Sequence, residues 1–187
     1  MADINILAPF ILSFEGGFVN DPHDRGGATN RGVTLTTWKS AGYDKDGDGD
    51  IDVQDLKIIT PEDAVNVVLR PHYWNRWKAD DIECQSIANI LVDWVWHSGS
   101  PAIKRPQALL GVVADGQVGP KTIAALNAQD PHEFFLKLKE NRKAFYEGIC
   151  AKNPSQNRFL KGWLRRLDAI GWGTLQDNGG KVRTFEP

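Results

Sequence analysis

The chain has 187 residues, of which 41% are hydrophobic, and its mean hydropathy is -0.38. This composition is typical of a soluble globular protein with enough apolar material for one domain or two small ones. The formal net charge of -2 gives no overall attraction to nucleic acid, and no apolar run reaches the roughly 18 residues of a membrane-spanning helix. We therefore expect a monomer with neither a nucleic-acid partner nor an integral membrane segment.

The first predicted element is an N-terminal helix. Apolar residues from Ile4 to Phe14 recur at helical spacing, and the pattern stops at Glu15, which Gly16 and Gly17 follow. The two glycines can adopt positive φ, so they can end the helix and turn the chain. Glu15 would then lie at the negative end of the helix dipole beside apolar side chains. A carboxyl group tends to keep its proton there, as a general acid requires.

A polar loop follows, and it carries a second carboxylate and a hydroxyl group. Asp24 stands nine residues after Glu15, and Thr29 stands five residues after Asp24. In glycoside hydrolysis one carboxylic acid protonates the leaving oxygen, while a second polar group positions a water molecule or stabilises the developing cation. Spacing alone leaves another interpretation open, in which Glu15 is a solvated helix-end residue, Asp24 a turn residue and Thr29 a helix cap.

The string from Glu15 to Thr34, EGGFVNDPHDRGGATNRGVT, resembles the N-terminal signature of glycoside hydrolase family 108. This family comprises phage endolysins and prophage relatives that are also labelled lysozyme-like or secretion-activator proteins. The match is nearly unbroken, with Arg31 standing where a bulky aromatic residue is more usual. The resemblance implies N-acetylmuramidase activity on peptidoglycan with Glu15 as the catalytic acid. A looser analogy with phage-type lysozymes makes Asp24 and Thr29 secondary candidates.

Residues 44–55, DKDGDGDIDVQD, match the calcium-loop pattern D-x-D-x-D-G-x-I-x-x-x-[DE]. Gly49 supplies the bend at position 6, and Ile51 is the apolar anchor at position 8. Position 12 is Asp55, which is shorter than the usual Glu, and the preceding segment is too short for a full entering helix. We therefore expect an isolated, dockerin-like structural site, the alternative being a charged, solvated turn. The predicted Ca²⁺ ligands are Asp44, Asp46, Asp48, Asp50, Asp52 and Asp55.

The middle of the chain contains two predicted helices and an aromatic cluster. Thr60 caps the first helix, and Pro71 is its expected end. The cluster 72–77, HYWNRW, forms either a wall of the cleft or ordinary packing. Residues 86–96 are nearly all apolar, which predicts a core helix. His97 follows where the family motif more usually has Asn, and it either reaches the cleft or is a capping or satisfied core histidine.

Residues 107–122 resemble a peptidoglycan-binding module, with QALLG followed by DGQVGPKT. No linker rich in Pro, Gly or Ser precedes this segment, so we expect it to pack as part of the same body. Two more helices, 131–151 and 154–172, are predicted after it. The segment from residue 137 to residue 166 contains nine Lys or Arg and only two Glu. This excess of positive charge predicts either a basic surface for the anionic cell wall or simply solvated helix faces.

Tryptophan and cysteine give weaker signals. The seven tryptophans are a large number for this length, and they suit either core packing or the aromatic faces of a sugar-binding cleft. Cys84 and Cys150 form no metal-binding pattern with the histidines. The start of the chain lacks a basic segment and a small-residue cleavage site, so we expect no signal peptide. This favours free thiols, although a single disulfide stays open.

Helical periodicity dominates the chain, and no segment shows sustained period-two alternation. We predict a mainly α, lysozyme-like fold with two lobes, with Glu15 in the cleft and an EF-hand-like calcium loop insertion at 44–55. The expected parts are a catalytic region at 1–90, a peptidoglycan-binding helical region at 91–175 and a loosely held polar tail at 176–187.

The predicted function is that of a peptidoglycan hydrolase that cleaves the β-1,4 bond between N-acetylmuramic acid and N-acetylglucosamine, with Glu15 as general acid. Two alternatives stay open: a lytic transglycosylase, and a non-catalytic wall-binding or secretion-accessory protein. Peptidoglycan is the expected partner, and Ca²⁺ is the one expected cofactor. Without a signal peptide, the protein would stay in the cytoplasm until it is exported or released to act on the cell wall.

Overall fold

The computed structural model describes residues 1–20 and 27–187. Its α-helices are α1 (Ile4–Ser13), α2 (Leu35–Ala41), α3 (Val53–Ile58), α4 (Pro61–Asp63), α5 (Gln85–Ser98), α6 (Pro101–Leu109), α7 (Pro120–Asn127), α8 (Pro131–Lys152) and α9 (Asn157–Asp168). A π-helix and three 3-10 helices join them: η1 (Ala64–Trp74), η2 (Asn75–Trp77), η3 (Ala79–Asp81) and η4 (Pro154–Gln156). The strands are β1 (Thr29–Asn30), β2 (Val33–Thr34), β3 (Ile170–Gly171), β4 (Thr174–Gln176) and β5 (Val182–Thr184).

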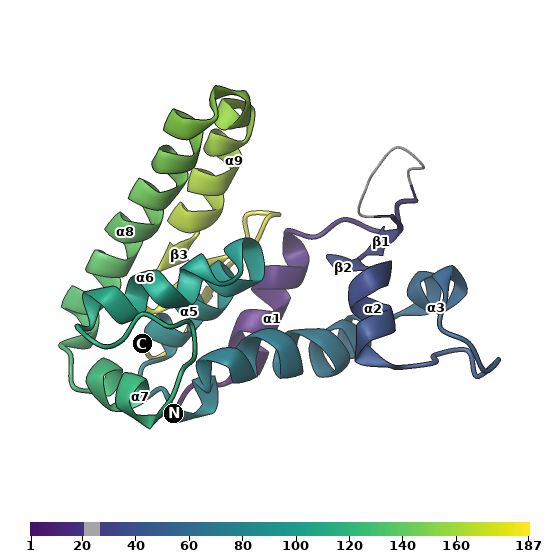
Figure 1. The fold of residues 1–187 in the computed structure, drawn as a ribbon, viewed down its shortest axis with the longest axis horizontal. Helices are drawn as coiled ribbons and strands as arrows, with labels where there is room; N and C mark the ends of the chain where they lie inside the picture. The colour runs from purple at the N-terminus through teal and green to yellow at the C-terminus, as the bar shows by residue number, and fades with distance from the viewer. Residues whose placement is uncertain (21–26) are drawn as a thin grey trace.

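The helices form two groups with α1 between them (Figure 1). On one side α5 and α6 lie beneath the long pair α8 and α9, which pack side by side. On the other side lie the antiparallel β1–β2 hairpin, α2 and α3, and η1 runs from this group back toward the first. The prediction of a mainly helical fold is confirmed, and the arrangement fits a lysozyme-like fold.

Two hydrophobic clusters underlie the two groups. The larger cluster joins apolar side chains of α1, α5, α7 and α8 and continues into β3 and β4. The smaller cluster lies in the other group and consists of Ala28, Val33, Trp38, Leu56, Ile59, Ala64 and Val68. Tyr73 and Trp96 pack against both clusters, so they mark the junction between the two groups.

Helix α5 is the central element of the larger cluster. Every residue from Gln85 to Val95 is buried, which confirms the predicted core helix, and the helix extends to Ser98. Four of the seven tryptophans are fully buried, which indicates core packing for Trp38, Trp74, Trp77 and Trp94.

The helix predicted after Thr60 does not end at Pro71. Thr60 caps α4 as expected, but the chain then continues as the π-helix η1 through Pro71 to Trp74. In an α-helix the proline ring would clash with the carbonyl group four residues earlier and would remove one hydrogen bond. The wider turns of a π-helix use a different hydrogen-bond register, which accommodates the proline.

The segment predicted as a loosely held tail is part of a sheet. Strand β4 pairs antiparallel with both β3 and β5, so residues 176–187 continue a three-stranded sheet. Leu175 is buried and Phe185 packs against the larger cluster. The Asp177 carboxylate accepts hydrogen bonds from the N–H groups of Gly179 and Lys181, which fixes the turn. The prediction of a loosely held tail failed because strands of two or three residues cannot show the alternation of apolar and polar residues that identifies a strand.

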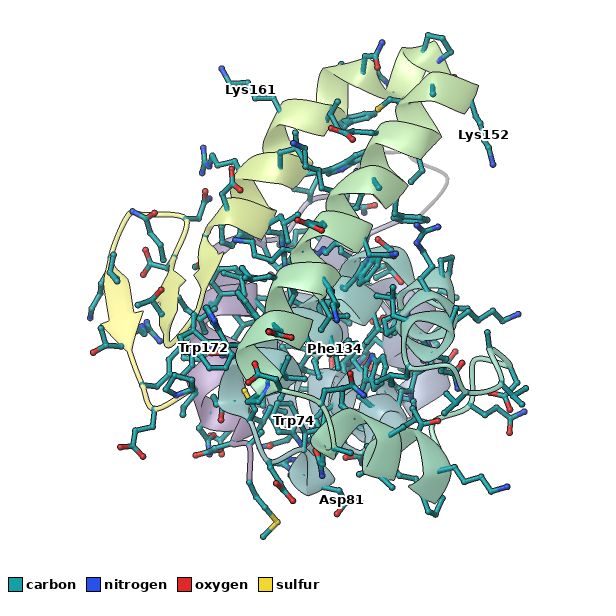
Figure 2. The ribbon with its side chains drawn as sticks, turned by 90° about the vertical axis from the view of Figure 1, so that its left-hand side faces the viewer. Trp74, Asp81, Phe134, Lys152, Lys161 and Trp172 are labelled. Atoms are coloured by element: carbon teal, nitrogen blue, oxygen red, sulfur yellow. The ribbon has the colours of Figure 1, made fainter. Side chains whose placement is uncertain are left out.

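The basic residues of α8 and α9 divide into two sets. Lys152 and Lys161 project from the far end of this helix pair (Figure 2), whereas Arg142 and Arg166 are buried inside the protein. The surface is therefore less basic than the count along the sequence suggested.

Both cysteines, Cys84 and Cys150, are free thiols. None of the described helices combines the length and apolar character needed to cross a membrane.

Candidate active site

Glu15 lies directly after helix α1, as predicted. Phe14 caps the helix, and the N–H of Glu15 still donates to the carbonyl of Leu12 at 3.2 Å. The side chain of Glu15 is 20% exposed, so solvent reaches it. Its Oε1 atom accepts a hydrogen bond from Nε1 of Trp96 at 2.9 Å and lies 3.3 Å from Nη1 of Arg166. Two contacts from α5 and α9 therefore fix one side of the carboxyl group.

The turn of the β1–β2 hairpin forms another side of the site. Gly32 has a φ of 76°, and a Cβ atom at this position would lie 2.6 Å from Cδ of Glu15. The backbone N–H of Arg31 donates to the carbonyl of Gly16 at 3.1 Å, which ties the hairpin to the segment after Glu15. The absence of a side chain at Gly32 lets the carboxyl group lie against the hairpin.

The two secondary candidates differ in what can be said of them. Thr29 lies in β1, where it exchanges two backbone hydrogen bonds of 2.8 Å with Val19, so its strand is joined to the chain that leaves Glu15. Within the described residues, the hydroxyl group of Thr29 forms no hydrogen bond with Glu15. Asp24 lies outside the described residues. The catalytic roles of Thr29 and Asp24 therefore stay predictions.

Tyr73 adds an aromatic wall beside Glu15. Its ring lies 4.6 Å from that of Trp96, centroid to centroid. Burial raises the pKa of Tyr73, and although Arg76 opposes this effect, the negative charge of Glu15 adds to it. Of the aromatic cluster at 72–77, Trp74 and Trp77 are buried packing residues, whereas Tyr73 reaches the site. A pocket of about 330 Å³ is also lined by Tyr73, together with Thr36, Thr37, Ser40, His72 and Arg76.

A buried ion-pair network lies behind Glu15. Asp93 is fully buried in α5, and its Oδ1 atom accepts hydrogen bonds from Nη2 and Nε of Arg166 at 2.8 and 3.0 Å. Its Oδ2 atom lies 2.7 Å from Nη2 of Arg142 in α8. Burial alone would raise the pKa of Asp93, but the two guanidinium groups outweigh burial and hold this pKa at about 2. Asp93 is therefore ionised and paired on both oxygens.

His97 is a partnered histidine at the edge of this network. Its Nδ1 atom lies 3.1 Å from the hydroxyl of Tyr146, and its ring packs edge-on against Tyr146 and Trp163. Burial lowers the pKa of His97 to about 4, although the nearby Asp93 carboxylate opposes this shift. Of the two roles predicted for His97, this environment favours a satisfied, largely buried histidine.

Sequence reasoning missed Arg166, Asp93 and Gly32. Asp93 gave a usable signal, because a lone carboxylate within a nearly all-apolar helix is expected to have a charged partner. Arg166 gave none: it stands 151 residues after Glu15, among other basic residues of an amphipathic helix. Gly32 lies within the family signature, but the chemical need for glycine there is visible only in its contact with Glu15.

The acidic loop at 44–55 brings its aspartates together in two groups. Carboxylate oxygens of Asp44, Asp46 and Asp48 lie within 4.8 Å of one another, and so do those of Asp50, Asp52 and Asp55. Asp55 is buried, and its carboxylate accepts hydrogen bonds from the N–H groups of Lys45, Asp46 and Asp52. Asp55 therefore closes the loop by joining its beginning to the start of α3.

The DGQ turn within the segment 107–122 is held by the side chain of Gln107 and by the Asp115 carboxylate, which accepts a hydrogen bond from the N–H of Gln117 at 2.8 Å. The amide of Gln107 donates to the Asp115 carboxylate and to the carbonyl of Gln117, each at 2.9 Å. It also accepts a hydrogen bond from the N–H of Gly116 at 2.8 Å, and Gly116 has a φ of 83°. The tight turn predicted from the sequence is present, and Gln107 stabilises it.

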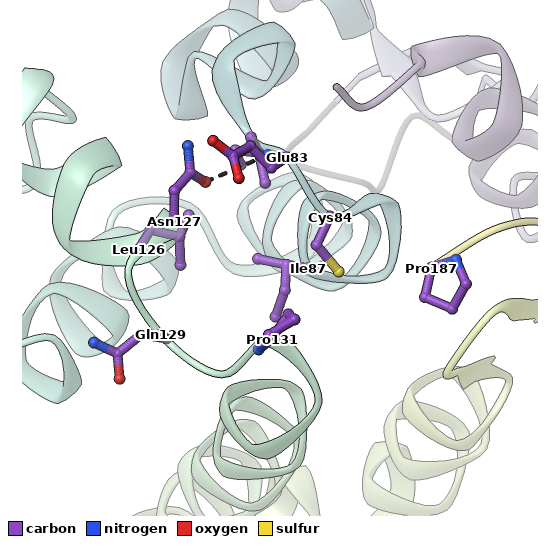
Figure 3. A pocket seen from close by; sticks show the side chains of 9 residues that line it. Glu83, Cys84, Ile87, Leu126, Asn127, Gln129, Pro131 and Pro187 are labelled. Atoms are coloured by element: carbon purple, nitrogen blue, oxygen red, sulfur yellow. Dashed lines mark hydrogen bonds between the residues drawn. The ribbon is translucent and has the colours of Figure 1, made fainter.

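A separate pocket of about 250 Å³ lies beside the C-terminal residue (Figure 3). It contains Glu83 and Cys84 at the start of α5, Asn127 at the end of α7, and the C-terminal Pro187. The side chain of Asn127 accepts a hydrogen bond from the N–H of Glu83 at 3.3 Å. None of the predicted catalytic or metal-binding residues lines this pocket.

Comparison with known proteins agrees with this geometry. The family Glycosyl hydrolase 108 matches residues 8–99, and the family described as Predicted Peptidoglycan domain matches residues 101–168. The solved structure of SagA from Brucella abortus is 32% identical to this chain, covers 87% of both chains and superposes with a TM-score of 0.70. No curated protein matches the chain.

These matches define the class of protein to which the site belongs, namely the glycoside hydrolases. The chain belongs to glycosyl hydrolase family 108, as the resemblance of residues 15–34 predicted. Together with the peptidoglycan domain, this membership makes the chain a peptidoglycan hydrolase that acts on the cell wall.

Proposed function

We propose that this peptidoglycan hydrolase is an N-acetylmuramidase that cleaves the β-1,4 bond between N-acetylmuramic acid and N-acetylglucosamine, with Glu15 as its general acid. The observation that carries the proposal is the setting of Glu15. Its partly exposed carboxyl group is held by Trp96 and Arg166 where the two hydrophobic clusters meet. Such a fixed and accessible acid suits the cleavage of a bound glycan strand.

In the proposed reaction the carboxyl group of Glu15 donates its proton to the glycosidic oxygen, and the bond between that oxygen and the anomeric carbon breaks. A water molecule then adds to the anomeric carbon and releases a proton to the solvent, and the carboxylate of Glu15 takes up a proton from the solvent before the next turnover. The indole N–H of Trp96 donates a hydrogen bond to Oε1 of Glu15, while Oε2 has no hydrogen-bond partner within the described residues. We assign orientation of the water to Asp24 and Thr29 on the basis of their order in the sequence.

The pocket lined by Tyr73 supports a sugar substrate. Three hydroxyl-bearing residues, Thr36, Thr37 and Ser40, line it together with the cationic side chain of Arg76. Hydroxyl groups suit the hydroxyl and amide groups of the glycan, and the arginine suits a carboxylate of the peptide attached to muramic acid. Tyr73 connects this pocket to Glu15, so a glycan strand could contact both.

The proposal is tested by the release of reducing ends from purified peptidoglycan, with the products identified by mass spectrometry. Glu15→Gln removes the transferable proton with little change in shape, and we expect the rate to fall by about 100-fold or more. The matched control is Glu62→Gln, which changes an exposed glutamate of α4 and should keep the wild-type rate.

The products distinguish the alternatives. Hydrated muramic acid ends that disappear with Glu15→Gln would support the muramidase. Anhydro ends would instead identify a lytic transglycosylase, in which the hydroxyl group of the substrate replaces water. Binding of the wild-type protein to peptidoglycan without product release, across several wall types and with calcium present, would favour the wall-binding or secretion-accessory protein.

We also propose that residues 44–55 bind one structural Ca²⁺. Oxygen ligands of one Ca²⁺ lie about 2.3–2.6 Å from the ion, so two of them lie at most about 5 Å apart. The 4.8 Å limit is compatible with this geometry for the three ligand atoms of each aspartate group, and one ion held by both groups would draw them closer together. Asp55 already accepts three backbone hydrogen bonds, and a carboxylate has about four acceptor positions, so Asp55 would contribute one ligand atom. Bound Ca²⁺ would neutralise the crowded aspartates and hold the loop closed.

A further inference from the structure

We propose that Arg166 is the positioning residue of Glu15, and that the buried Asp93 carboxylate fixes the guanidinium group of Arg166 and offsets part of its positive charge at Glu15. The inference rests on the proposed role of Glu15 as the general acid. It also gives a function in the active site to a part of the chain that matches a peptidoglycan domain.

The guanidinium group of Arg166 is fixed in orientation. Its Nε and Nη2 atoms both donate to Oδ1 of Asp93, which leaves Nη1 directed at Oε1 of Glu15. The rings of Phe10 and Phe14 lie beside the group, with centroids 5.9 and 4.9 Å from its carbon. The side chain is only 9% exposed. Because Arg166 cannot follow the motion of Glu15, it defines one position for the carboxyl group.

The charges of this network alternate. Glu15 is followed by Arg166, then by Asp93 and then by Arg142, with the shortest separations at 3.3, 2.8 and 2.7 Å. An uncompensated arginine beside a general acid would keep the acid ionised and therefore inactive. Here the shortest contacts of Arg166 are with Asp93. The negative charge of Asp93 therefore offsets much of the positive potential that Arg166 produces at Glu15. The arrangement combines a rigid donor with a moderate positive charge.

The other groups that face Glu15 differ from Arg166 in charge or in direction. Trp96 of α5 donates a hydrogen bond but carries no charge, and Tyr73 of η1 is neutral at physiological pH, because burial raises its pKa. The Nε atom of Arg31, in the hairpin turn, donates to the carbonyl of Ile59. Among the described residues, Arg166 is the cation that forms an ion pair with Glu15.

The network crosses the boundary between the two matched families. Glu15 and Asp93 lie within residues 8–99, whereas Arg142 and Arg166 lie within residues 101–168. The region that matches the peptidoglycan domain therefore completes the immediate surroundings of the acid. In this proposal α8 and α9 contribute to catalysis as well as to any binding of the wall.

Two variants separate charge from geometry at position 166. Arg166→Gln removes the charge but keeps an amide donor for Asp93, and it leaves the Asp93–Arg142 pair intact. Arg166→Lys keeps the charge but loses the planar fork that contacts Asp93 and Glu15 together. The matched control is Arg70→Gln, which breaks an exposed 3.6 Å ion pair with Asp80. For each protein, kcat and KM on soluble peptidoglycan fragments are measured against pH, and folding is checked by thermal melting.

We expect the alkaline limb of the pH profile to follow the charge at position 166. In Arg166→Gln the loss of the positive charge beside the acid should move the alkaline limb to higher pH. In Arg166→Lys the limb should stay near the wild-type position while kcat falls by about tenfold. KM should change little in either variant, and Arg70→Gln should match the wild type. A folded Arg166→Gln protein with an unmoved limb would overturn the proposal.

Two further measurements keep the test decisive. If Arg166→Gln does not fold, an Arg166→Lys protein with wild-type kcat would overturn the positioning role, and one with reduced kcat and an unmoved limb would support it. The carboxyl signal of Glu15 can also be titrated by carbon NMR, after assignment with Glu15→Gln. That titration tests the coupling to Arg166 even if the wild-type protein releases no sugar, an outcome that would contradict the proposed muramidase alone.

Discussion

The missing side chain of Gly32 decides how closely the β1–β2 hairpin approaches Glu15. The carboxyl group of Glu15 lies against the backbone of Gly32, so closely that a methyl group at position 32 would overlap it. The positive φ of Gly32 adds a second reason for glycine, because other residues adopt this conformation only with strain. The hairpin turn and the acid are therefore fitted to each other, although 17 residues separate them along the chain.

The first residue-scale prediction is that Gly32→Ala impairs activity more than stability. The added Cβ would displace the carboxyl group of Glu15, so the rate of reducing-end release should fall by about tenfold or more. The free energy of unfolding should fall by only about 1–2 kcal/mol from backbone strain. Gly42→Ala is the matched control, because Gly42 has a similar φ of 71° but a Cβ atom there would meet no other atom within 4 Å. Equal loss of activity in both variants would contradict the prediction.

At the scale of elements, the acidic loop is closed by its own hydrogen bonds before any ion is considered. Asp44 accepts hydrogen bonds from Gly47 and Gly49 through its two oxygens, and Asp55 joins the beginning of the loop to α3. Asp52 and Asp55 also form a capping box at the start of α3. The loop is thus held closed by its own side chains, which limits the reordering that the proposed Ca²⁺ binding would require.

The prediction at this scale concerns calcium binding. Calorimetric titration of the metal-free protein should show one Ca²⁺ per chain, with a dissociation constant of about 1 mM or tighter, and Ca²⁺ should raise the melting temperature. Asp48→Asn should weaken binding by about tenfold because it removes one ligand charge. Asp81→Asn, in the 3-10 helix η3 and outside the loop, is the control and should bind as the wild type does. If the wild-type protein binds no Ca²⁺ at millimolar concentration, the proposal is contradicted.

At the scale of the whole molecule, the buried network holds α5, α8 and α9 together. Asp93 of α5 pairs with Arg142 of α8 and Arg166 of α9, and His97 of α5 contacts Tyr146 of α8 and Trp163 of α9. Because these groups are buried, the energies of their charged and neutral forms differ between the folded and the unfolded chain. The cohesion of the three helices should therefore depend on pH.

We predict a loss of stability between about pH 6.5 and pH 4 that depends on His97. In this window the unfolded chain binds a proton at position 97 and the folded chain does not, because the folded pKa is about 4 and the ordinary pKa of a histidine is 6.5. The free energy of unfolding should therefore fall by about 3 kcal/mol as the pH drops through this window. Below about pH 4, protonation of Asp93 adds a further loss of the same sign as the pH approaches 2.

The measurement is chemical denaturation at a series of pH values for the wild type, His97→Asn and the exposed-site control His72→Asn. His97→Asn should be less stable at pH 7 through lost packing, but its stability should decline less between pH 6.5 and 4. His72→Asn should keep the wild-type decline. An identical decline in His97→Asn and the wild type would contradict the assignment to His97.

The local signals in the sequence were sufficient to place several helix ends and the core helix. Helical spacing and the glycines after Glu15 correctly placed the end of α1, and the apolar run at 86–96 correctly placed the core helix. Thr60 and Asp130 begin helices with side-chain caps, which depend on residues at most three positions away. The signature at 15–34 also identified the family. Where the signals were weak, as for the short strands β3–β5, the prediction failed.

Only the tertiary structure decided what surrounds the acid. Arg166 reaches Glu15 from 151 residues away and Trp96 from 81 residues away, and Asp93 meets Arg166 across 73 residues. Spacing along a chain carries information about neighbours within a turn or two, whereas these contacts depend on how α1, α5 and α9 pack. The sequence by itself thus determined the family, the candidate acid Glu15 and the helix that ends before it, and packing determined the charge and the geometry around that carboxyl group.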